Sequence, residues 1–552
     1  MSGVDLSILP KTINIPNKPL GHFLEEAAAK FPGRPALIFM KSVTTYSELD
    51  RQVRQFMNVL RSLGVAKGDV VALMSPNCPQ TIIAYQAALR VGAIVTQLSP
   101  LYVEREVENQ LNDSGAKVAV VANLMIKVFA GAVDKTKVEK VIVFNMQDSM
   151  AWPICWIAPL IWKYKEKRNV TIPSNPKILH WSALMASAPE KAETALIDPE
   201  DLALYQYTGG TTGASKGVEL THRNLVANTL QAKAWFIGAE EGKETMILAL
   251  PIFHVFGMTV GMNTGFSIAA TLVVIPKFDA ADVMSLIQKY KATVFPGVPL
   301  MYQKINDSPE AAKYDISSIR FCISGAAPLA KITKEKFEKT TGGKLAEGYG
   351  LTEASPVTHC NPLIGGAKVG SIGVALPSTE HKVISAETGQ VAKPMETGEL
   401  LIRGPQVMRG YKGKPEDTAK TIINGWLYTG DMGYIDEDGF VFLVDRKKEM
   451  VITGGLNVYC TELEEALRKM DGVAEVAIIG EPDLTYGENV VAVVVRAADS
   501  AITEKEVIAF SKENLAGYKV PKKVVFLEAL PKTIIGKVLK REIKRILKDK
   551  PA

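Results

Sequence analysis

The sequence predicts an α/β protein with a large N-terminal domain, made of stacked α/β subdomains and a β subdomain, and a small α+β C-terminal domain. Three observations support this fold class: helical patterns alternate with short apolar strands up to residue 300, short strands and turns follow residue 370, and a charged stretch at 444–448 precedes the last part. The chain has 552 residues, more than one hydrophobic core usually organises, so at least two domains are expected.

The N-terminal part shows the alternation that parallel sheets covered by helices produce. Asp69–Met74 is an expected strand and Gln80–Leu89 the helix that follows it. Further strands are expected at Lys291–Phe295 and Ile319–Ser324. The last of these leads into a turn of small residues at 325–327, and ligands often bind where such strands end.

A change of texture after residue 370 predicts an antiparallel β subdomain. Gly398–Gly404 is an expected strand, and the acidic turn Asp436–Gly439 is an expected connection between two more. We place the end of the N-terminal domain at residue 445, so that it covers 1–445.

Residues 446–552 form the predicted C-terminal domain. It is expected to contain a helix at Thr461–Met470 and strands at Glu475–Ile479 and Val490–Val495, which is an α+β pattern.

Composition and charge exclude some function classes. The net charge of +5, from 64 basic and 59 acidic residues, is too small to suggest nucleic-acid binding. The five cysteines show no paired or metal-ligand spacing, which is typical of a reducing compartment, and the N-terminus lacks the pattern of a secretory signal. A cytoplasmic protein is therefore expected.

Residues 150–168 combine three tryptophans with a basic end. The apolar part is shorter than the roughly twenty residues that a membrane-spanning helix needs. Aromatic rings beside Lys and Arg suit contact with a membrane surface, so a peripheral association with the inner face of the membrane is one interpretation. A buried edge hairpin or loop is the other.

The run from Tyr207 to Gly217, Tyr-Thr-Gly-Gly-Thr-Thr-Gly-Ala-Ser-Lys-Gly, suits phosphate binding. Glycines let successive backbone N–H groups face an anion, while hydroxyls and Lys216 add donors and charge. It is not a Walker A loop, because Ser215 precedes the lysine and Gly217 follows it. Apolar residues on both sides predict the tip of a hairpin, and an ordinary polar hairpin remains the alternative.

Four more segments carry polar side chains of the types that bind nucleotides: Glu347-Gly348-Tyr349-Gly350-Leu351-Thr352-Glu353, Trp426–Asp431, Asp445–Lys448 with Gly454–Asn457, and Leu530–Lys537. Each has an ordinary structural explanation when taken alone. Glu353 could start a helix, Asp431 could form a turn, and the lysines could belong to solvated charged stretches.

In order and spacing these segments resemble the signature motifs of the adenylate-forming superfamily, which contains acyl-CoA synthetases, luciferases and adenylation domains. The resemblance runs from about residue 20 to residue 545. Within the superfamily the chain most resembles bacterial long-chain fatty-acid–CoA ligases, through Tyr205–Tyr207, Gly404–Met408 and Gly517–Pro521. Those ligases also carry an aromatic and basic insertion near 150–168, which favours the membrane interpretation.

The resemblance implies a reaction in two steps with Mg·ATP and coenzyme A. A fatty acid would attack the α-phosphorus of ATP to give an acyl-adenylate and pyrophosphate, and coenzyme A would then displace AMP. The residues expected to bind ATP or AMP are Thr208, Gly209, Gly210, Thr211, Thr212, Lys216, Gly325, Ala326, Ala327, Glu347, Gly348, Tyr349, Gly350, Thr352, Asp431, Arg446 and Lys537.

Several of these residues have individual roles by resemblance. Glu353 would hold Mg²⁺, a cation that prefers carboxylate and phosphate oxygens. Asp431 would accept hydrogen bonds from the ribose, assisted by Arg446. The residues expected to be catalytic are Thr208, His254, Glu353 and Lys537, of which Lys537 would bridge the carboxylate and the α-phosphate.

The resemblance also assigns the acyl site and the moving parts. His254 would border the acyl carboxylate and Met258 would gate the acyl tunnel, although both residue types are also common in cores. The C-terminal domain would be mobile and rotate about a hinge near 445–448, at Lys448, which brings Gly454 and Gly455 to the coenzyme A path. Cys460 departs from the family pattern, where proline is usual, and its effect is expected in the second step.

The expected function is an ATP-dependent acyl-CoA synthetase for a medium- to long-chain fatty acid. A CoA ligase for an aryl or alicyclic acid is the enzyme alternative, and an acyl-AMP ligase is disfavoured because the extra segment of that group is absent. A non-catalytic fatty-acid-binding or uptake protein is the alternative from another class. The partners expected are small molecules and no nucleic acid, and the resemblance allows a homodimer.

Overall fold

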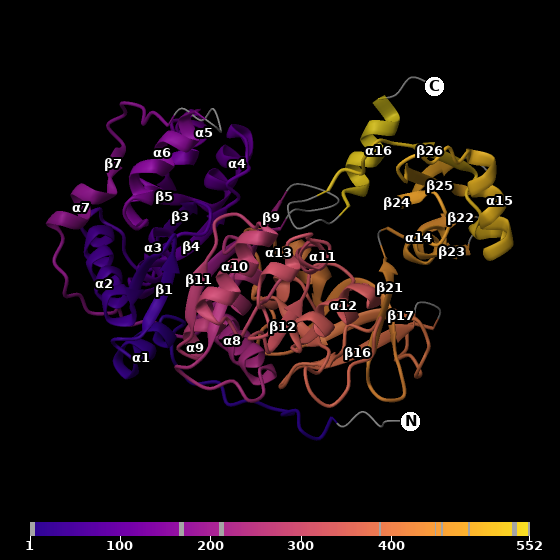
Figure 1. Ribbon diagram of the computed structural model, residues 1–552, viewed down its shortest axis with the longest axis horizontal. Coiled ribbons are helices and arrows are strands. Elements are labelled where there is room, and N and C mark those ends of the chain that lie inside the picture. The colour runs from indigo at the N-terminus through magenta and orange to yellow at the C-terminus, as the bar shows by residue number, and fades with distance from the viewer. Residues whose placement is uncertain are drawn as a thin grey trace.

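The computed structural model describes residues 6–164, 170–208, 215–385, 388–447, 449–453, 456–483, 486–532 and 538–549. A large N-terminal domain carries a small C-terminal domain at one end of the long axis, as Figure 1 shows. The predicted fold class is confirmed.

The first sheet of the N-terminal domain has eight strands, and it places the predicted hairpin at its edge. Its order is β18 (Gly410–Tyr411), β9 (Lys216–Thr221), β8 (Leu202–Thr208), β4 (Ile94–Leu98), β3 (Val70–Met74), β5 (Ala116–Ala122), β6 (Lys140–Phe144) and β7 (Ile178–His180). Strands β8 to β7 run parallel, whereas β9 and β18 are antiparallel to their neighbours. Residues 410–411 therefore lie beside the hairpin although they are distant in sequence.

A second sheet stacks on the first. It contains β10 (Thr245–Leu248), β11 (Thr271–Val274), β1 (Pro35–Phe39) and β2 (Ser42–Thr45) in that order. Bridges of Val294 to Met246 and Phe321 connect β10 to the strands β12 (Phe321–Ser324), β13 (Lys344–Gly350), β14 (Val357–Cys360) and β15 (Val374–Ala375).

The predicted strand at Lys291–Phe295 is wrong, because only Val294 of that segment forms bridges. Helix α10 (Ala280–Tyr290) ends directly before it, and Lys291 has a left-handed backbone with φ 48°. Lys291 therefore ends the helix instead of starting a strand, and few residues remain that could pair with neighbouring strands.

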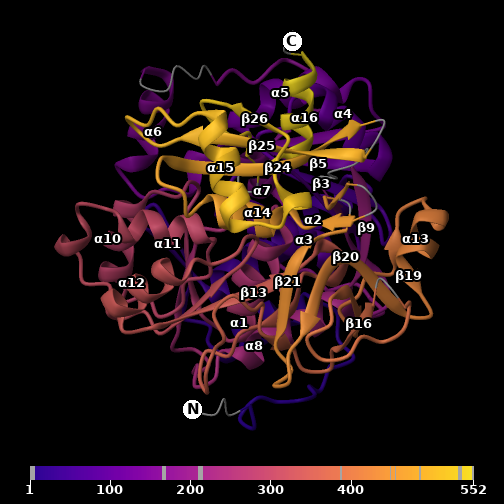
Figure 2. The same ribbon diagram turned by 90° about the vertical axis from the view of Figure 1, so that its right-hand side faces the viewer.

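Helices fill three layers around the two sheets (Figures 1 and 2). One core joins the sheets to the helices between them, which are α1 (His22–Lys30), α2 (Tyr46–Ser62), α3 (Pro79–Arg90), α8 (His222–Trp235), a π-helix at Gly257–Asn263 and α9 (Thr264–Ser267). The outer face of the first sheet packs on α4 (Glu104–Ser114) and α5 (Ile126–Val133), and that of the second on α10, α11 (Pro299–Asn306) and α12 (Lys331–Thr341).

Local sequence explains where several of these helices begin. Thr45 and Thr221 each accept a backbone N–H of the first turn, from Glu48 and Asn224, and so cap α2 and α8.

The predicted antiparallel β subdomain is present. Its strands are β16 (Glu380–Ser385), β17 (Gly398–Arg403), β20 (Trp426–Ile435) and β19 (Ile422–Ile423), with β21 (Val441–Arg446) paired to β20. The acidic turn at 436–439 connects β20 to β21 as expected. Helix α13 (Pro415–Thr421) lies between β18 and β19.

The C-terminal domain has its own sheet and its own apolar cores. The sheet order is β23 (Leu456–Val458), β22 (Val451–Thr453), β25 (Gly487–Arg496) and β24 (Val473–Asp483), with β26 (Lys523–Phe526) parallel to β25. Helices α14 (Cys460–Leu467), α15 (Glu504–Asn514) and α16 (Lys540–Asp549) accompany it. The predicted helix at 461–470 is α14, which is shorter at its end.

Cys460 begins α14 in place of the proline that the family usually has. Its buried Sγ donates a hydrogen bond to the Glu449 carbonyl oxygen at 2.9 Å. The thiol therefore ties the helix start to the segment after the predicted hinge.

The segment at 150–168 contains an exposed helix rather than a buried hairpin or loop. Helix α6 (Ile154–Tyr164) buries Ala158 and Trp162 against the core, and α7 (Trp181–Ser187) follows β7. Among the described residues, no helix combines the length and the apolar character that crossing a bilayer requires.

Candidate functional site

The predicted phosphate loop connects two paired strands. Thr208 ends β8 and pairs with Lys216 at the start of β9, and the Ser215 hydroxyl donates to the Thr208 carbonyl oxygen at 2.5 Å. The hairpin prediction is confirmed. The other loop residues assigned to ATP, Gly209, Gly210, Thr211 and Thr212, lie outside the described residues.

Lys216 of this hairpin faces α13. Its Nζ lies 2.8 Å from Asp417 Oδ2 and 4.9 Å from the centre of the Tyr411 ring. The lysine thus has an anionic partner and an aromatic face, and its side chain is 37% exposed, so a phosphate could still reach it.

The segment from Glu347 to Glu353 leads from a strand into a short turn. Glu347 to Gly350 end β13, and Thr352 begins a 3₁₀ turn that also holds Glu353. Gly350 is required there, because a Cβ would lie 2.1 Å from the Pro356 carbonyl oxygen.

The Glu353 side chain and backbone are both held by a distant segment. The Tyr411 hydroxyl donates to Glu353 Oε1 at 2.8 Å, and the Met408 N–H donates to the Glu353 carbonyl oxygen at 2.7 Å. The orientation of this carboxylate is therefore set by tertiary contacts.

Asp431 lies between two other predicted site residues. Its Oδ1 is 3.0 Å from Arg446 Nε, its Oδ2 accepts from the Tyr349 hydroxyl, and it is 4% exposed. Asp431 and Arg446 are direct partners across the β20–β21 pair. Burial, together with the neighbouring Asp431 carboxylate, raises the pKa of Tyr349, so its hydroxyl remains a donor.

The turn at Gly325, Ala326 and Ala327 lies next to Tyr349. Strands β12 and β13 are parallel, and Ser324 pairs with Glu347, so the turn after Ser324 starts beside the segment Glu347–Glu353. A Cβ on Gly325 would lie 3.0 Å from the Phe256 ring, so the glycine allows the turn to pack closely against this ring. Burial raises the pKa of Glu347 to about 7.

His254 lies just before the π-helix, and Met258 lies in its first turn. The Phe256 N–H donates to His254 Nδ1 at 3.2 Å, and burial lowers the His254 pKa to about 4, so the ring is neutral near pH 7. Gln206 of β8 donates to the Phe253 carbonyl oxygen at 3.1 Å, which joins this segment to the hairpin strand. Met258 is fully buried, and its Sδ lies 3.5 Å from Gln97 Nε2.

Four predicted residues of the C-terminal half lie outside the described residues: Lys448, Gly454, Gly455 and Lys537. Their neighbours are well anchored. Lys447 Nζ lies 2.7 Å from Glu399 Oε2, and Lys540 Nζ lies 2.9 Å from Glu464 Oε1.

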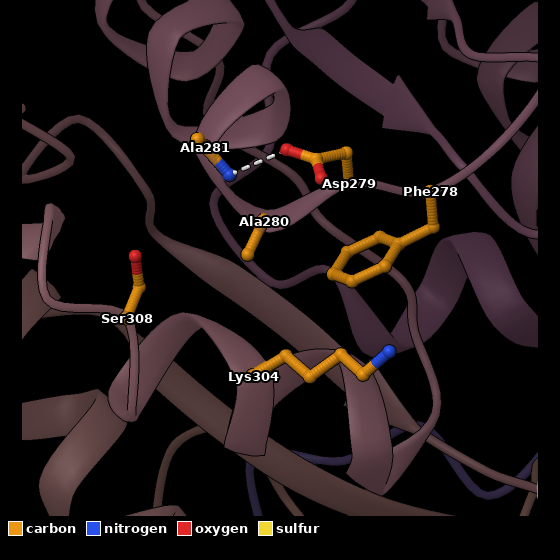
Figure 3. Close-up of a pocket in the computed structure, with 6 residues that line it drawn as sticks. All are labelled: Phe278, Asp279, Ala280, Ala281, Lys304 and Ser308. Atoms are coloured by element: carbon orange, nitrogen blue, oxygen red, sulfur yellow. Dashed lines mark hydrogen bonds between the residues drawn. The ribbon is translucent and has the colours of Figure 1, made fainter.

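A cavity of about 290 Å³ lies away from these residues, at the start of α10 (Figure 3). Asp279 Oδ1 accepts the Ala281 N–H at 3.0 Å and so caps the helix within this cavity. None of the predicted site residues lines it.

Sequence reasoning missed Tyr411 and Asp417. Both contact predicted site residues, yet they belong to a strand of two residues and a short helix in another part of the chain. The segment Gly404–Met408, which supported the family resemblance, ends just before Tyr411 and was the available signal.

Comparison with known proteins shows to which family of proteins the chain belongs. The family model for AMP-binding enzymes matches residues 24–412, and the model for the C-terminal domain of AMP-binding enzymes matches residues 462–537. The chain belongs to the family of AMP-binding enzymes, as the resemblance indicated.

Particular relatives match almost the whole chain. A long-chain-fatty-acid–CoA ligase of Bacillus subtilis is 42% identical over 97% of this chain and 96% of its own length. A 4-coumarate–CoA ligase of Nicotiana tabacum is 34% identical over 96% and 95%. The ATP-bound crystal structure of MatB from Rhodopseudomonas palustris superposes with a TM-score of 0.84 at 31% identity, covering 97% of this chain and 99% of that one.

Proposed function

We propose that the protein is an ATP-dependent acyl-CoA synthetase that activates a medium- to long-chain fatty acid. The observation that carries this proposal is the meeting of Tyr349, Asp431 and Arg446 at a buried carboxylate, in a chain that belongs to the family of AMP-binding enzymes. The similarity to a long-chain-fatty-acid–CoA ligase supports the choice of substrate class.

In the first step the acid carboxylate attacks the α-phosphorus of ATP, and the bond from that phosphorus to the bridging oxygen breaks to release pyrophosphate. Asp431 holds the ribose hydroxyls, Tyr349 and the turn at 325–327 bracket the adenine, and Lys216 attracts the leaving phosphates. Thr208, Thr352 and Lys537 are proposed to contact the phosphates or the carboxylate from the loops that carry them. The neutral His254 borders the acid without adding a charge.

Mg²⁺ fits the phosphate side of this site. Among the described residues, no three His, Cys, Asp or Glu side chains gather as a protein-built metal site. Mg²⁺ bound with ATP does not require one, since it is usually held by one or two carboxylates and phosphate oxygens. Glu353 offers such a carboxylate, and the bound metal neutralises charge on the phosphates.

The second step is proposed to need a movement of the C-terminal domain. We place the domains at 1–445 and 446–552, with the hinge near 445–448 at Lys448. Rotation withdraws Lys537 and brings Gly454 and Gly455 to the path of coenzyme A, whose thiol attacks the acyl carbonyl carbon and displaces AMP.

A substrate panel tests the reaction and its substrate class. We would measure CoA thioester formation and pyrophosphate release for straight-chain acids from acetate to oleate, with benzoate and cyclohexanecarboxylate. A preference for long chains with both products is expected. Asp431→Asn should lose both products, whereas Asp438→Asn, on the exposed turn of the same strand pair, should keep them.

Two other outcomes have distinct meanings. A preference for ring acids would keep the mechanism and replace the substrate class; the 34% identity to a 4-coumarate–CoA ligase is the observation behind this alternative, and it is lower than the 42% to the fatty-acid ligase. No pyrophosphate release with any acid would support the non-catalytic binding or uptake protein instead.

We also propose that α6 binds a membrane surface. Trp152, Trp156, Leu160 and Tyr164 are 81%, 77%, 56% and 71% exposed, while Trp162 on the opposite side is buried in the core. Exposed tryptophans beside Lys163 suit the headgroup layer of an anionic membrane, where rings lie at the boundary and cations meet lipid phosphates.

Vesicle binding tests this contact. Wild type should co-sediment with phosphatidylglycerol vesicles, the double variant Trp152→Ser, Trp156→Ser should not, and Leu196→Ser, at a position 94% exposed elsewhere, should behave as wild type. Equal binding by the double variant would refute the contact. Light scattering on the same proteins without vesicles measures the molar mass in solution and so tests the homodimer that the resemblance allows.

A further inference from the structure

The segment formed by β18 and α13, residues 410–421, contacts two separate parts of the proposed ATP site. We propose that Tyr411 and Asp417 are positioning residues for its phosphate end: Tyr411 orients the Glu353 carboxylate, and Asp417 is the counter-ion that holds Lys216 when no phosphate is bound. This inference rests on the proposed function of the site.

Tyr411 is well placed to orient Glu353. Its hydroxyl donates to Glu353 Oε1 at 2.8 Å, and its own backbone is fixed by pairing with Val218 and by a hydrogen bond from its N–H to Thr418 Oγ1 at 2.9 Å. Burial, and next the charge of Glu353, raises the pKa of Tyr411, so the hydroxyl stays a donor. One carboxylate oxygen is thereby engaged, and among the described residues no hydrogen bond to the other oxygen is found, so it is the oxygen proposed to meet a cation.

Asp417, on α13, forms an ion pair with Lys216 and neutralises its charge. The two charged groups lie 2.8 Å apart, and both side chains are about a third exposed, at 37% and 36%. Lys216 Nζ also lies over the Tyr411 ring, so the same tyrosine contacts both Lys216 and Glu353. Four side chains, Glu353, Tyr411, Lys216 and Asp417, therefore form one connected row.

This arrangement has a consequence for binding and release. A phosphate of ATP that reaches the exposed side of Lys216 competes with Asp417 for the same ammonium group. When pyrophosphate leaves, Asp417 can take the lysine back, and the exchange favours release. Asp417 should thus weaken ATP binding slightly and hasten the loss of pyrophosphate.

The Tyr411 part is tested with Tyr411→Phe and the control Tyr434→Phe, whose ring stacks on Phe442 in the β subdomain. Binding of Mn²⁺, as a spectroscopic probe for Mg²⁺, is measured by electron paramagnetic resonance on enzyme saturated with ATP and without acid. We expect about tenfold weaker metal binding in Tyr411→Phe, with metal-free ATP binding unchanged, as for loss of a hydrogen bond to a charged group. Wild-type metal affinity in Tyr411→Phe would overturn this role.

The Asp417 part is tested with Asp417→Asn and the control Glu416→Gln, an exposed acid one residue away on the same helix. Calorimetry in EDTA should show ATP binding about three- to fivefold tighter in Asp417→Asn and unchanged in Glu416→Gln. Pyrophosphate should also inhibit Asp417→Asn more strongly. Unchanged or weaker ATP binding would overturn the counter-ion role.

These outcomes are separate from those of the proposed function. If wild type binds ATP and metal but makes no thioester with any acid, the proposed reaction fails while the two positioning roles can still be scored. If wild type makes thioesters and the variants bind ATP and metal as it does, the positioning roles alone fail.

Discussion

At the scale of single residues, the contacts of Asp431 within the protein suit its proposed role in holding the ribose. One of its oxygens already accepts a hydrogen bond from Tyr349, the other forms an ion pair with Arg446, and the carboxylate is almost fully buried. Each carboxylate oxygen can accept more than one bond, so ribose hydroxyls can join these partners without displacing them. The contacts with Tyr349 and Arg446 offset the free energy lost when the Asp431 carboxylate is removed from water.

Lys537→Ala should separate the two half-reactions. Lys537 is proposed to stabilise charge only during adenylation, so pyrophosphate release should fall by about a hundredfold or more, while thioester formation from supplied acyl-AMP should change little. Rapid-quench assays of each half-reaction measure this. Lys532→Ala, at a lysine that pairs with Glu475, is the control and should affect neither. Equal losses in both half-reactions would remove Lys537 from its assigned role.

His222 should make the protein sensitive to mild acid. Its ring is 1% exposed, burial lowers its pKa to about 4, and Nδ1 accepts the Leu20 N–H at 3.2 Å. Because the unfolded ring titrates near its ordinary pKa of about 6.5, the unfolded state binds more protons below that pH, and stability falls as pH falls from about 6.5 towards 4. The free energy of unfolding should lose about 2 kcal/mol from this ring between pH 7 and pH 5.

Urea unfolding of wild type and His222→Asn at the two pH values measures this contribution. Asparagine keeps an acceptor for Leu20 but does not titrate, so its stability should depend less on pH. The same pH dependence in both proteins would show that another group carries the effect.

At the scale of elements, the π-helix at Gly257–Asn263 packs unusually close to its neighbours. Gly257 and Gly261 of this helix and Gly265 of α9 recur every four residues; Gly261 and Gly265 face strands of the second sheet, whereas Gly257 faces the segment that follows β10. A Cβ would lie 2.5 Å from Leu248 Cδ1 at Gly261 and 2.4 Å from Leu272 Cδ2 at Gly265, and only 2.3 Å from the Pro251 carbonyl oxygen at Gly257. Gly261 and Gly265 thus let the chain approach the sheet closely, and Gly257 lets it approach the backbone at 250–251.

Gly257→Ala should be more destabilising than Gly261→Ala. At Gly261 the obstacle is the end of a flexible leucine side chain, so the cost should be about 1 kcal/mol. At Gly257 it is a backbone oxygen that also accepts the His254 N–H at 3.1 Å, so the cost should reach about 3 kcal/mol or more. Chemical denaturation measures both, and equal or reversed costs would contradict this account of the packing.

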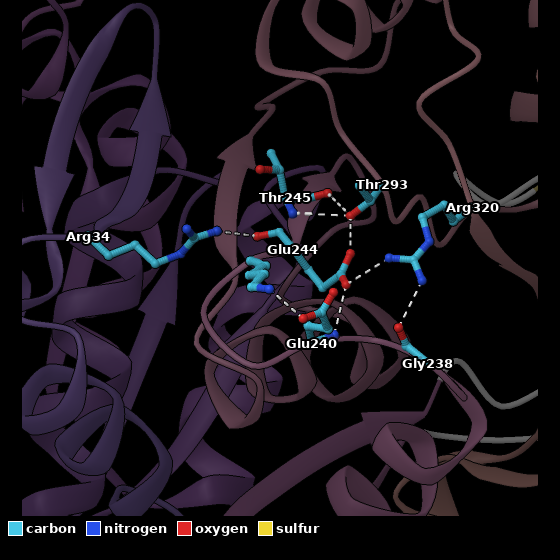
Figure 4. A network of polar contacts seen from close by, with 8 residues as sticks. Arg34, Gly238, Glu240, Glu244, Thr245, Thr293 and Arg320 are labelled. Carbon is cyan, nitrogen blue, oxygen red and sulfur yellow. Dashed lines mark hydrogen bonds and ion pairs between the residues drawn. The ribbon is translucent and has the colours of Figure 1, made fainter.

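Local patterns predicted most elements but not the pairing of distant ones. The strand at 70–74, the helix at 79–90 and the hairpin around residue 208 follow from apolar runs and turn residues near them in sequence. The segment 291–295 has the composition of a strand, but Lys291 caps the end of α10, and the Thr293 side chain contacts a buried carboxylate from another part of the chain. Thr293 donates to Glu244 Oε2, and Arg320 binds the same carboxylate (Figure 4).

The site shows the same limit. Thr208, Glu353 and Asp431 are proposed as site residues from the sequence because each lies in a short motif. The contact between Tyr411 and Glu353 joins residues 58 positions apart, and no local pattern encodes it. The exposed face of α6 could be predicted from composition only as one of two interpretations, because burial of a tryptophan depends on what the rest of the chain places beside it.

At the scale of the whole molecule, contacts hold the chain on both sides of the proposed hinge. Before it, Lys447 pairs with Glu399, and Asp445 Oδ2 accepts the Thr461 N–H of the C-terminal domain at 3.3 Å. After it, Lys540 lies 3.7 Å from Glu449 and 2.9 Å from Glu464. Any rotation must break the contact between Asp445 and Thr461, while the contacts of Lys540 can move with the small domain.

Lys448→Pro should impair thioester formation and spare adenylation. Proline fixes one backbone dihedral at the proposed pivot and so opposes rotation, without touching groups assigned to the first step. We expect a loss of about tenfold or more in thioester formation from supplied acyl-AMP, with pyrophosphate release near wild type. Lys448→Ala serves as the control for loss of the side chain, and unimpaired thioester formation in Lys448→Pro would refute the rotation.

Helix α6 and the C-terminal domain lie at opposite ends of the long axis (Figure 1). A protein adsorbed through Trp152 and Trp156 would therefore rest on the N-terminal lobe, which does not rotate in the proposed cycle. Such an enzyme could complete its cycle without leaving the surface, so its encounters with fatty acid would take place by lateral diffusion in two dimensions. Its rate would then depend on the mole fraction of acid in the membrane rather than on the acid concentration in water.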